Sequence, residues 1–264
     1  MARCKVARVV PPLILATFAL VFIGCGNSHL IEKEYYSGVD LSSSEKFEST
    51  ASQAIFVNQL PAKKEQWAAL ETIHEDRSLS DHIQLFYSRR KTLKSNRASG
   101  KNSGNNDYWN REHVWPRSYG LKGLLLDKDL HNLVAVDRSI NSSRGNKYFD
   151  NGGDWHAECG SCKADFDSWE PPGTIKGDIA RISFYVNLML RNYPEKVDMK
   201  LATDRPPSSY THFGDLSTLL QWHCIDPVSD FERERNDIIY LYQKNRNPFV
   251  DHPEWVDIYF DSNC

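Results

Sequence analysis

Residues 110–116, which read NREHVWP, constrain this chain more than any other stretch of its 264 residues. Two further polar segments follow, DLHNL at 129–133 and NSSRGN at 141–146. Carboxylate and amide oxygens suit a hard cation, and an imidazole can activate a water molecule. The three segments, each close to hydrophobic residues, supply these groups as Glu112, His113 and Asn141.

The pattern around these segments predicts two strands followed by a helix. One strand is expected near 108–114 and a second at 130–136, where apolar residues cluster. Asp137 is a candidate N-cap for a helix that runs to Arg144, and Gly145 suits its C-terminal end. The order strand, loop, strand, helix follows.

Glu112 and His113 present a geometric difficulty, because neighbouring side chains on a regular strand point to opposite faces. A site shared by the two residues therefore requires bent backbone at this position. Pro116 is consistent with a strand that ends close by.

These residue types favour phosphodiester hydrolysis. A neutral His113 is a suitable base for water near neutral pH. Mg²⁺ keeps much of its hydration, so one carboxylate and one amide oxygen, from Glu112 and Asn141, are enough protein ligands. A zinc catalyst would need a cluster of His or Cys, which these segments lack. Arg144 shares a helix face with Asn141 and is the first choice for a phosphate contact, with a structural ion pair as the alternative.

The flanking pattern predicts a largely helical surround within one domain over residues 52–264. Apolar spacing over 52–87 indicates two amphipathic helices, and 88–107 is polar loop. An extended, cross-linked loop is expected at 147–174. Further helices are expected at 176–192, 215–223 and 229–244, the last with Asp230 as candidate cap.

The N-terminal residues are typical of an export signal. Three basic residues precede an apolar stretch that ends in Gly24-Cys25, and this stretch is short for a membrane span. We interpret 1–24 as a signal peptide and Cys25 as a lipidated residue of a bacterial lipoprotein; cleavage with free secretion and a retained anchor are the alternatives. Residues 25–51 are then expected to be a flexible tether.

The mature chain is acidic, so a polyanionic ligand needs a local basic patch. Removal of the three basic residues of the signal leaves 29 basic against 35 acidic residues. A basic stretch at 89–101 indicates either a solvated loop or an arm that follows a phosphate backbone. The candidate substrate contacts are Arg89, Arg90, Arg117 and Lys122.

The cysteines beyond Cys25 are even in number, namely Cys159, Cys162, Cys224 and Cys264. Disulfides are the expected state in an exported chain. A structural zinc site that includes His156, a redox-active Cys-x-x-Cys and free thiols are alternatives.

The three ordered segments resemble the successive motifs of the bacterial endonuclease I family, exported DNA-degrading enzymes with a His-Me finger (ββα-metal) core. The similarity extends to KGDIAR at 176–181, QWH at 221–223 and NRNPFVDHP at 245–253, and covers roughly residues 55–260. The resemblance implies an α+β fold with a His-Me finger core surrounded by mainly α-helices. It also implies that His113 is the general base and that Glu112 and Asn141 bind one Mg²⁺.

We therefore expect an exported Mg²⁺-dependent endonuclease that acts on DNA with little sequence preference and gives 5′-phosphate products; RNA is an additional candidate substrate, and the sequence leaves the preference between the two open. Mn²⁺ or Ca²⁺ is expected to substitute for Mg²⁺. Membrane contact is expected only through the lipid anchor, and no obligate protein partner is expected. A non-catalytic envelope nucleic-acid-binding protein and a small-nucleotide phosphodiesterase are the alternatives.

Overall fold

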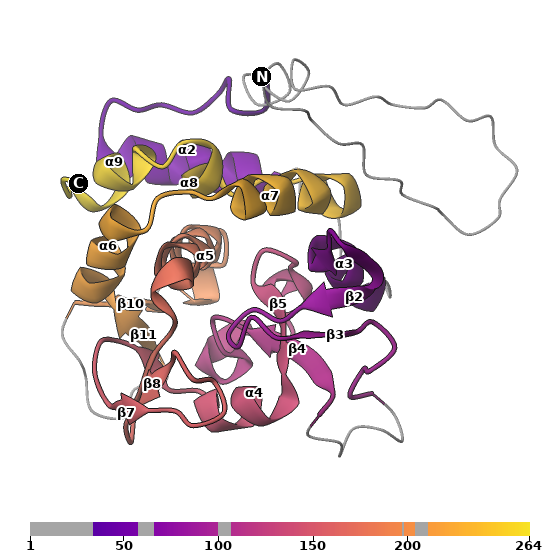
Figure 1. Cartoon of the computed structure of the whole chain (residues 1–264). Helices are drawn as coiled ribbons and strands as arrows, with labels where there is room; N and C mark the ends of the chain where they lie inside the picture. The colour runs from indigo at the N-terminus through magenta and orange to yellow at the C-terminus, as the bar shows by residue number, and fades with distance from the viewer. Residues whose placement is uncertain (1–33, 58–65, 100–106, 197, 204–210) are drawn as a thin grey trace, which may run out of the picture.

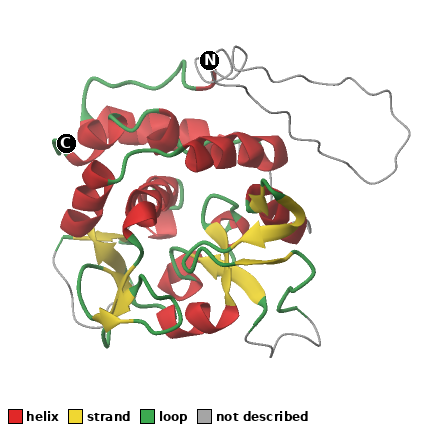
Figure 2. Ribbon diagram, viewed as in Figure 1, coloured by secondary structure: helices red, strands yellow, loops and turns green. Residues whose placement is uncertain are grey.

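The fold combines many helices with small sheets, as expected for the α+β class (Figures 1 and 2). In Figure 1, α2, α7, α8 and α9 form one side of the molecule, the strands and α4 lie on the opposite side, and α5 runs between them. None of the described helices is long and apolar enough to cross a membrane. This computed structural model describes residues 34–57, 66–99, 107–196, 198–203 and 211–264.

The elements have the following bounds. The helices are α2 (Ser44–Val57), α3 (Gln66–Ile73), α4 (Arg138–Arg144), α5 (Lys176–Leu190), α6 (Leu216–Ile225), α7 (Asp230–Gln243), α8 (Pro248–Asp251) and α9 (Trp255–Phe260). The strands are β1 (Glu75–Asp76), β2 (Leu79–Gln84), β3 (Lys91–Leu93), β4 (Trp109–His113), β5 (Leu133–Asp137), β6 (Tyr148–Phe149), β7 (Asp154–Trp155), β8 (Lys163–Ala164), β9 (Ser168–Glu170), β10 (Lys200–Ala202) and β11 (His212–Asp215). Short helical turns are η2 (Arg117–Leu121), η3 (Leu125–Lys128), η4 (Gly173–Ile175) and η5 (Pro194–Lys196).

The predicted succession of two strands and a helix is confirmed by β4, β5 and α4. The strands pair antiparallel in unbroken register, from Trp109 opposite Asp137 to His113 opposite Leu133. Asp137 occupies the N-cap position of α4, although its side chain makes no capping hydrogen bond. Gly145 ends the helix with a φ of 58°, a conformation that glycine adopts without strain.

Helix α5 is the centre of the core, because every residue from Gly177 to Leu190 is buried. A helix enclosed on all sides needs neighbours all round, and α2, α6, α8 and β10 supply them. The helices predicted at 215–223 and 229–244 correspond to α6 and α7. The cap of α7 is Ser229 rather than Asp230, in a reciprocal capping box with Glu232.

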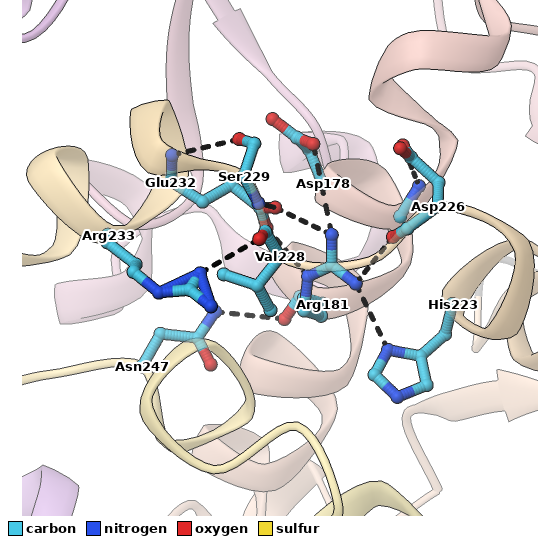
Figure 3. A network of polar contacts seen from close by, with 10 residues as sticks. Asp178, Arg181, His223, Asp226, Val228, Ser229, Glu232, Arg233 and Asn247 are labelled. Atoms are coloured by element: carbon cyan, nitrogen blue, oxygen red, sulfur yellow. Dashed lines mark hydrogen bonds and ion pairs between the residues drawn. The ribbon is translucent and has the colours of Figure 1, made fainter. Parts of the chain in front are cut away.

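A buried ionic network joins α5 to α6 and α7 (Figure 3). Arg181 donates through Nε and Nη2 to both carboxylate oxygens of Glu232, at 2.7 and 2.6 Å. Its Nη1 reaches His223 Nδ1 at 3.2 Å and the Asp226 carbonyl at 3.0 Å. A guanidinium that is fully enclosed needs such partners, so the motifs at 176–181 and 221–223 serve packing between helices.

The second helix predicted within 52–87 is wrong. That segment forms α3 and then the β1–β2 hairpin, with Ile83 paired to Glu75. Asp76 Oδ1 accepts hydrogen bonds from the backbone amides of Ser78 and Leu79, which stabilises the tight turn between the strands. These local hydrogen bonds favour a turn at a position where the spacing of apolar residues had predicted a helix.

The tether predicted over 25–51 is also corrected where the structure describes it. Residues from Ser44 onward form α2, whose Phe47 and Ala51 are buried against the core. The Tyr36 hydroxyl donates to Asp251 at 2.8 Å, so the chain is fixed even before this helix. Polar composition suggested a linker, but a few apolar residues at helical spacing are enough to anchor the segment. The predicted signal peptide 1–24 and lipidated Cys25 lie outside the described residues.

The cysteine prediction is confirmed in its disulfide form. Cys159 pairs with Cys162, and Cys224 pairs with Cys264. The first bond cross-links the expected extended segment at 147–174, which contains β6 to β9. The second ties α6 to the last residue of the sequence. Structural zinc and free thiols at these four positions are therefore excluded.

Phe47→Ala tests whether α2 belongs to the folded domain. Because the Phe47 side chain is fully buried, its truncation should lower the free energy of unfolding by about 3–5 kcal/mol. Ser49→Ala, at an exposed position of the same helix, should change it by less than about 0.5 kcal/mol. Urea denaturation of both variants measures the difference, and equal stability would restore the tether interpretation.

Candidate active site

Glu112 and His113 lie on β4 and leave it on opposite faces. The Glu112 carboxylate accepts hydrogen bonds from Tyr87 and from Arg144 of α4, at 3.1 and 2.8 Å. The His113 ring instead contacts Asp127 of η3. Because the pairing with β5 is regular through both residues, the bent backbone expected here is wrong.

Helix α4 resolves the geometric difficulty, because it binds the edge of β4 that faces away from β5. Alternate residues of an antiparallel strand turn their backbone groups outward. The outward carbonyls of Arg111 and His113 accept hydrogen bonds from Asn141 and Arg144, at 3.2 and 3.0 Å. The two faces of a strand meet at its edge. Side chains from both faces, here Glu112 and His113, can therefore contact a ligand that is bound at the edge of β4 beside α4.

Arg144 is a positioning residue and not a phosphate contact, which corrects the sequence prediction. Its side chain is 0% exposed, and the Glu112 side chain beside it is 4% exposed. The guanidinium also donates to the Val114 carbonyl at 2.7 Å and lies over the Phe149 ring. Enclosed in this way, Arg144 has no open side for a phosphate, and the alternative of a structural ion pair is the correct one.

The charge state of Glu112 reflects opposing effects. Burial raises the pKa of its carboxyl group to about 7, while Arg144, Tyr87 and the backbone amide of His113 lower it. Metal binding needs the ionised form, and Arg144 is the largest of the influences that favour it. The ion pair with Arg144 therefore offsets part of the effect of burial, and the ionised form of Glu112 gains with rising pH through about 7.

Asn141 is oriented as an oxygen donor. Its Nδ2 donates to Asn110 Oδ1 at 2.7 Å and to the Arg111 carbonyl at 3.2 Å. Both amide hydrogens are thus used, and Oδ1 is turned away from these partners. One ionised carboxylate and one fixed amide oxygen on neighbouring elements fit the donor set of a largely hydrated Mg²⁺.

His113 is prepared to act as a base at Nδ1. Its Nε2 lies 3.0 Å from the Asp127 carbonyl, which can only accept, so Nε2 carries the hydrogen of the neutral ring. This leaves Nδ1 unprotonated. Burial lowers the pKa of His113, and the charges of Arg117 and Arg111 lower it further, whereas Asp127 raises it. The ring is therefore neutral at neutral pH.

Asn132 holds the segment that follows His113, a role the sequence did not reveal. Its carbonyl and Oδ1 accept from the amides of Val114 and Trp115, at 3.0 and 2.8 Å. Its Nδ2 donates to the Trp115 carbonyl at 3.0 Å. The signal was present, since Asn132 belongs to the DLHNL segment, but the pattern alone did not indicate its partner.

The predicted substrate contacts divide into two groups. Arg117 forms an ion pair with Asp127, beside His113. Lys122 follows η2 and is exposed. Arg90 instead pairs with Asp137 at 2.6 Å, at the opposite end of the β4–β5 pair, and Arg89 donates to Gln84. The structure therefore does not bring Arg89 and Arg90 to the site.

The basic stretch at 89–101 is not a free phosphate-binding arm where it is described. Arg89 donates to the side chain of Gln84, the other described cations pair with carboxylates of the surrounding strands and of α3, and Lys101 lies outside the described residues. The ion pairs are Arg90 with Asp137, Lys91 with Asp76, Lys94 with Glu75 and Arg97 with Glu71.

A family model described as Endonuclease I matches residues 44–254 of the chain. The chain belongs to the Endonuclease I family. It is 39% identical over 226 residues to an extracellular ribonuclease of Bacillus subtilis (strain 168), covering 84% of this chain and 77% of that protein. It is 41% identical over 194 residues to an extracellular ribonuclease of Bacillus amyloliquefaciens, covering 72% of this chain and 65% of the relative.

A further relative is the Endonuclease-1 of Buchnera aphidicola subsp. Acyrthosiphon pisum (strain APS), 30% identical over 129 residues, which are 47% of this chain and 45% of that protein. The family match begins at the first residue of α2, in agreement with the buried position of this helix. Membership in this family makes the protein a nuclease.

Arg144→Gln tests the positioning role. Removal of the guanidinium leaves the Glu112 carboxylate buried without its partner, so the free energy of unfolding should fall by about 3–5 kcal/mol. Lys122→Gln, an exposed change of equal charge, should alter it by less than about 0.5 kcal/mol. Chemical denaturation measures the free energy of unfolding of both variants. A fully stable Arg144→Gln protein with weaker substrate binding would favour the phosphate contact instead.

Proposed function

We propose that this protein is an exported, Mg²⁺-dependent endonuclease that hydrolyses phosphodiester bonds of DNA and RNA with little sequence preference. The observation that carries the proposal is the arrangement around β4: the His113 ring is held through Nε2 by the Asp127 carbonyl, Glu112 precedes it on the strand, and Asn141 is attached to the same strand through the Arg111 carbonyl. Together with the family, the succession of β4, β5 and α4 supports a His-Me finger core.

The chain's own residues prepare the hydrolytic step. His113 Nδ1 accepts a proton from the attacking water, and the Asp127 carbonyl at Nε2 keeps the ring in the required tautomer. The Asp127 carboxylate, 3.4 Å from Nε2, stabilises the imidazolium that forms. Glu112 and Asn141 would hold Mg²⁺, which supplies Lewis-acid stabilisation of phosphoryl charge when bound. Attack of the water on phosphorus breaks the bond to the 3′ oxygen, which takes up a proton from solvent water and leaves as a 3′-hydroxyl, while the phosphate remains on the 5′ oxygen.

Water as the nucleophile explains why both nucleic acids are proposed as substrates. A mechanism that used the ribose 2′-hydroxyl would be confined to RNA, but attack by water needs no 2′-hydroxyl. Two relatives are named extracellular ribonucleases and others Endonuclease-1. Export is supported by the same extracellular relatives and by the basic and apolar start of the sequence, and lipidation of Cys25 is the form of export we propose.

The alternative of a non-catalytic nucleic-acid-binding protein loses its main support. It depended on the basic stretch at 89–101, in which Arg90, Lys91, Lys94 and Arg97 pair with carboxylates.

Replacement of the two site residues should have separable effects. His113→Ala should lower kcat by about 10²–10⁴-fold, because the base is lost, while Mg²⁺ binding persists. Glu112→Gln should raise the Mg²⁺ concentration needed for activity, because a charged ligand is lost. The measurement is relaxation of supercoiled plasmid over a Mg²⁺ titration, with EDTA as the metal-free arm. His82→Ala, at a partly exposed position of β2 whose ring contacts Asp81, is the matched histidine control. Full activity of a folded His113→Ala protein would refute the assignment.

The products distinguish attack by water from attack by a 2′-hydroxyl. Digestion of DNA and of RNA should give oligonucleotides with 5′-phosphate and 3′-hydroxyl ends in both cases. Mass spectrometry of the limit digests checks this outcome. Detection of 2′,3′-cyclic phosphates from RNA, with DNA left intact, would contradict the proposed chemistry.

A further inference from the structure

Arg111 makes no ion pair with a described residue. Burial lowers the pKa of its guanidinium, the charge of Arg117 lowers it further, and the more distant Asp127 carboxylate raises it. Arg111 is half-buried on β4, and its hydrogen-bond partner is the neutral amide of Gln66, which accepts from Nη1. Within the described parts of the chain, no carboxylate lies within ion-pair distance of its guanidinium. Partial burial of a cation without a direct ion pair is unfavourable, so this arrangement favours an anionic ligand.

The contrast with neighbouring cations is clear. Nearby basic side chains on β3, on the segment before β4 and on η2 form ion pairs with acidic residues; they are Lys91, Lys94, Arg97 and Arg117.

Two residues of α3 hold the Arg111 guanidinium in place. Its central carbon lies 4.8 Å from the centre of the Trp67 ring, a cation–π distance. Trp67 packs edge-on against the buried Trp109, with 4.9 Å between ring centres. Gln66 occupies one N–H of the guanidinium. The other N–H donors bond to no residue in the described ranges and are open to water or an anion. The group is thus oriented in advance for two-point contact with a phosphate.

Arg111 also lies on the same side of the molecule as the candidate base. It is two residues from His113 on a regular strand, so both side chains leave the same face, with roughly 7 Å between them. Gln66 connects the two, because its Nε2 donates to the Lys128 carbonyl at 3.0 Å. Lys128 follows Asp127, which binds His113. A nucleic-acid strand that contacts His113 is therefore also within reach of Arg111.

We propose that Arg111, held by Gln66 and Trp67, binds a backbone phosphate of the nucleic acid while His113 acts on the bond that is cut. This assignment rests on the proposed function, and it gives to Arg111 the phosphate contact that the sequence pattern assigned to Arg144. Trp67 and Gln66 are positioning residues for the guanidinium.

The test compares Arg111→Gln, Arg111→Lys and wild type in cleavage and in binding. Arg111→Gln should raise KM by about tenfold or more, with kcat changed by less than about threefold. It should also make the slope of log affinity against log salt shallower by about 1, because one phosphate contact is lost. Arg111→Lys keeps the charge and should keep the salt slope, with KM between the two. Affinity is read from the fluorescence anisotropy of a labelled DNA duplex in EDTA, where no cleavage is needed.

Arg77→Gln is the matched control, since it removes an arginine that pairs with Glu234 on exposed surface. It should leave KM and the salt slope unchanged. Trp67→Leu should raise KM without changing the salt slope, and Trp67→Phe should recover most of the loss.

The outcomes separate this assignment from the proposed function. An Arg111→Gln protein with wild-type affinity and salt slope overturns the assignment, even if the wild type is a fully active nuclease. Loss of kcat together with a lower melting temperature, at unchanged affinity, also overturns it in favour of a structural role. Weaker binding with a shallower slope supports it, even if the wild type binds DNA in EDTA but fails to cleave it when Mg²⁺ is supplied. Such a failure would refute the proposed function alone.

Discussion

The buried Arg144 guanidinium is the interaction on which the site depends. It forms an ion pair with the Glu112 carboxylate and donates hydrogen bonds to the carbonyls of His113 and Val114. One side chain thus favours the ionised form of the candidate ligand and holds the backbone of the candidate base. The same contacts attach α4, with Asn141, to the edge of β4. Loss of this group would affect folding and chemistry together, since a buried carboxylate without its partner is costly.

The two faces of β4 have different physical roles. One face carries Glu112 into an enclosed environment, where burial would leave it uncharged without Arg144. The other carries His113 and Arg111, which remain partly exposed and are held by η3 and α3. The site that we propose at the shared edge would combine a buried carboxylate, paired with Arg144, with a base and a cation that a large substrate can reach. A regular strand therefore suits the proposed reaction, because it separates the buried ligand from the groups that contact the substrate.

The family-like motifs far from the site contribute through packing. Asp129 of the DLHNL segment accepts hydrogen bonds from Tyr185 of α5 and Gln243 of α7. Arg181 and Glu232 join α5 to α7 in the network of Figure 3. These buried polar groups are satisfied by one another, and they fix the loop that leads into β5.

The sequence by itself determined β4, β5 and α4, because short apolar runs, a cap position and a glycine act locally. It also indicated Glu112, His113 and Asn141, since their chemistry is characteristic wherever they lie. Only the tertiary structure decided which cations are free. Arg144 and Arg90 are as basic as Arg111 in the sequence, yet buried carboxylates bind the first two and an amide binds the third. Such pairings join residues that are far apart in the chain, so they cannot be predicted from the local sequence pattern.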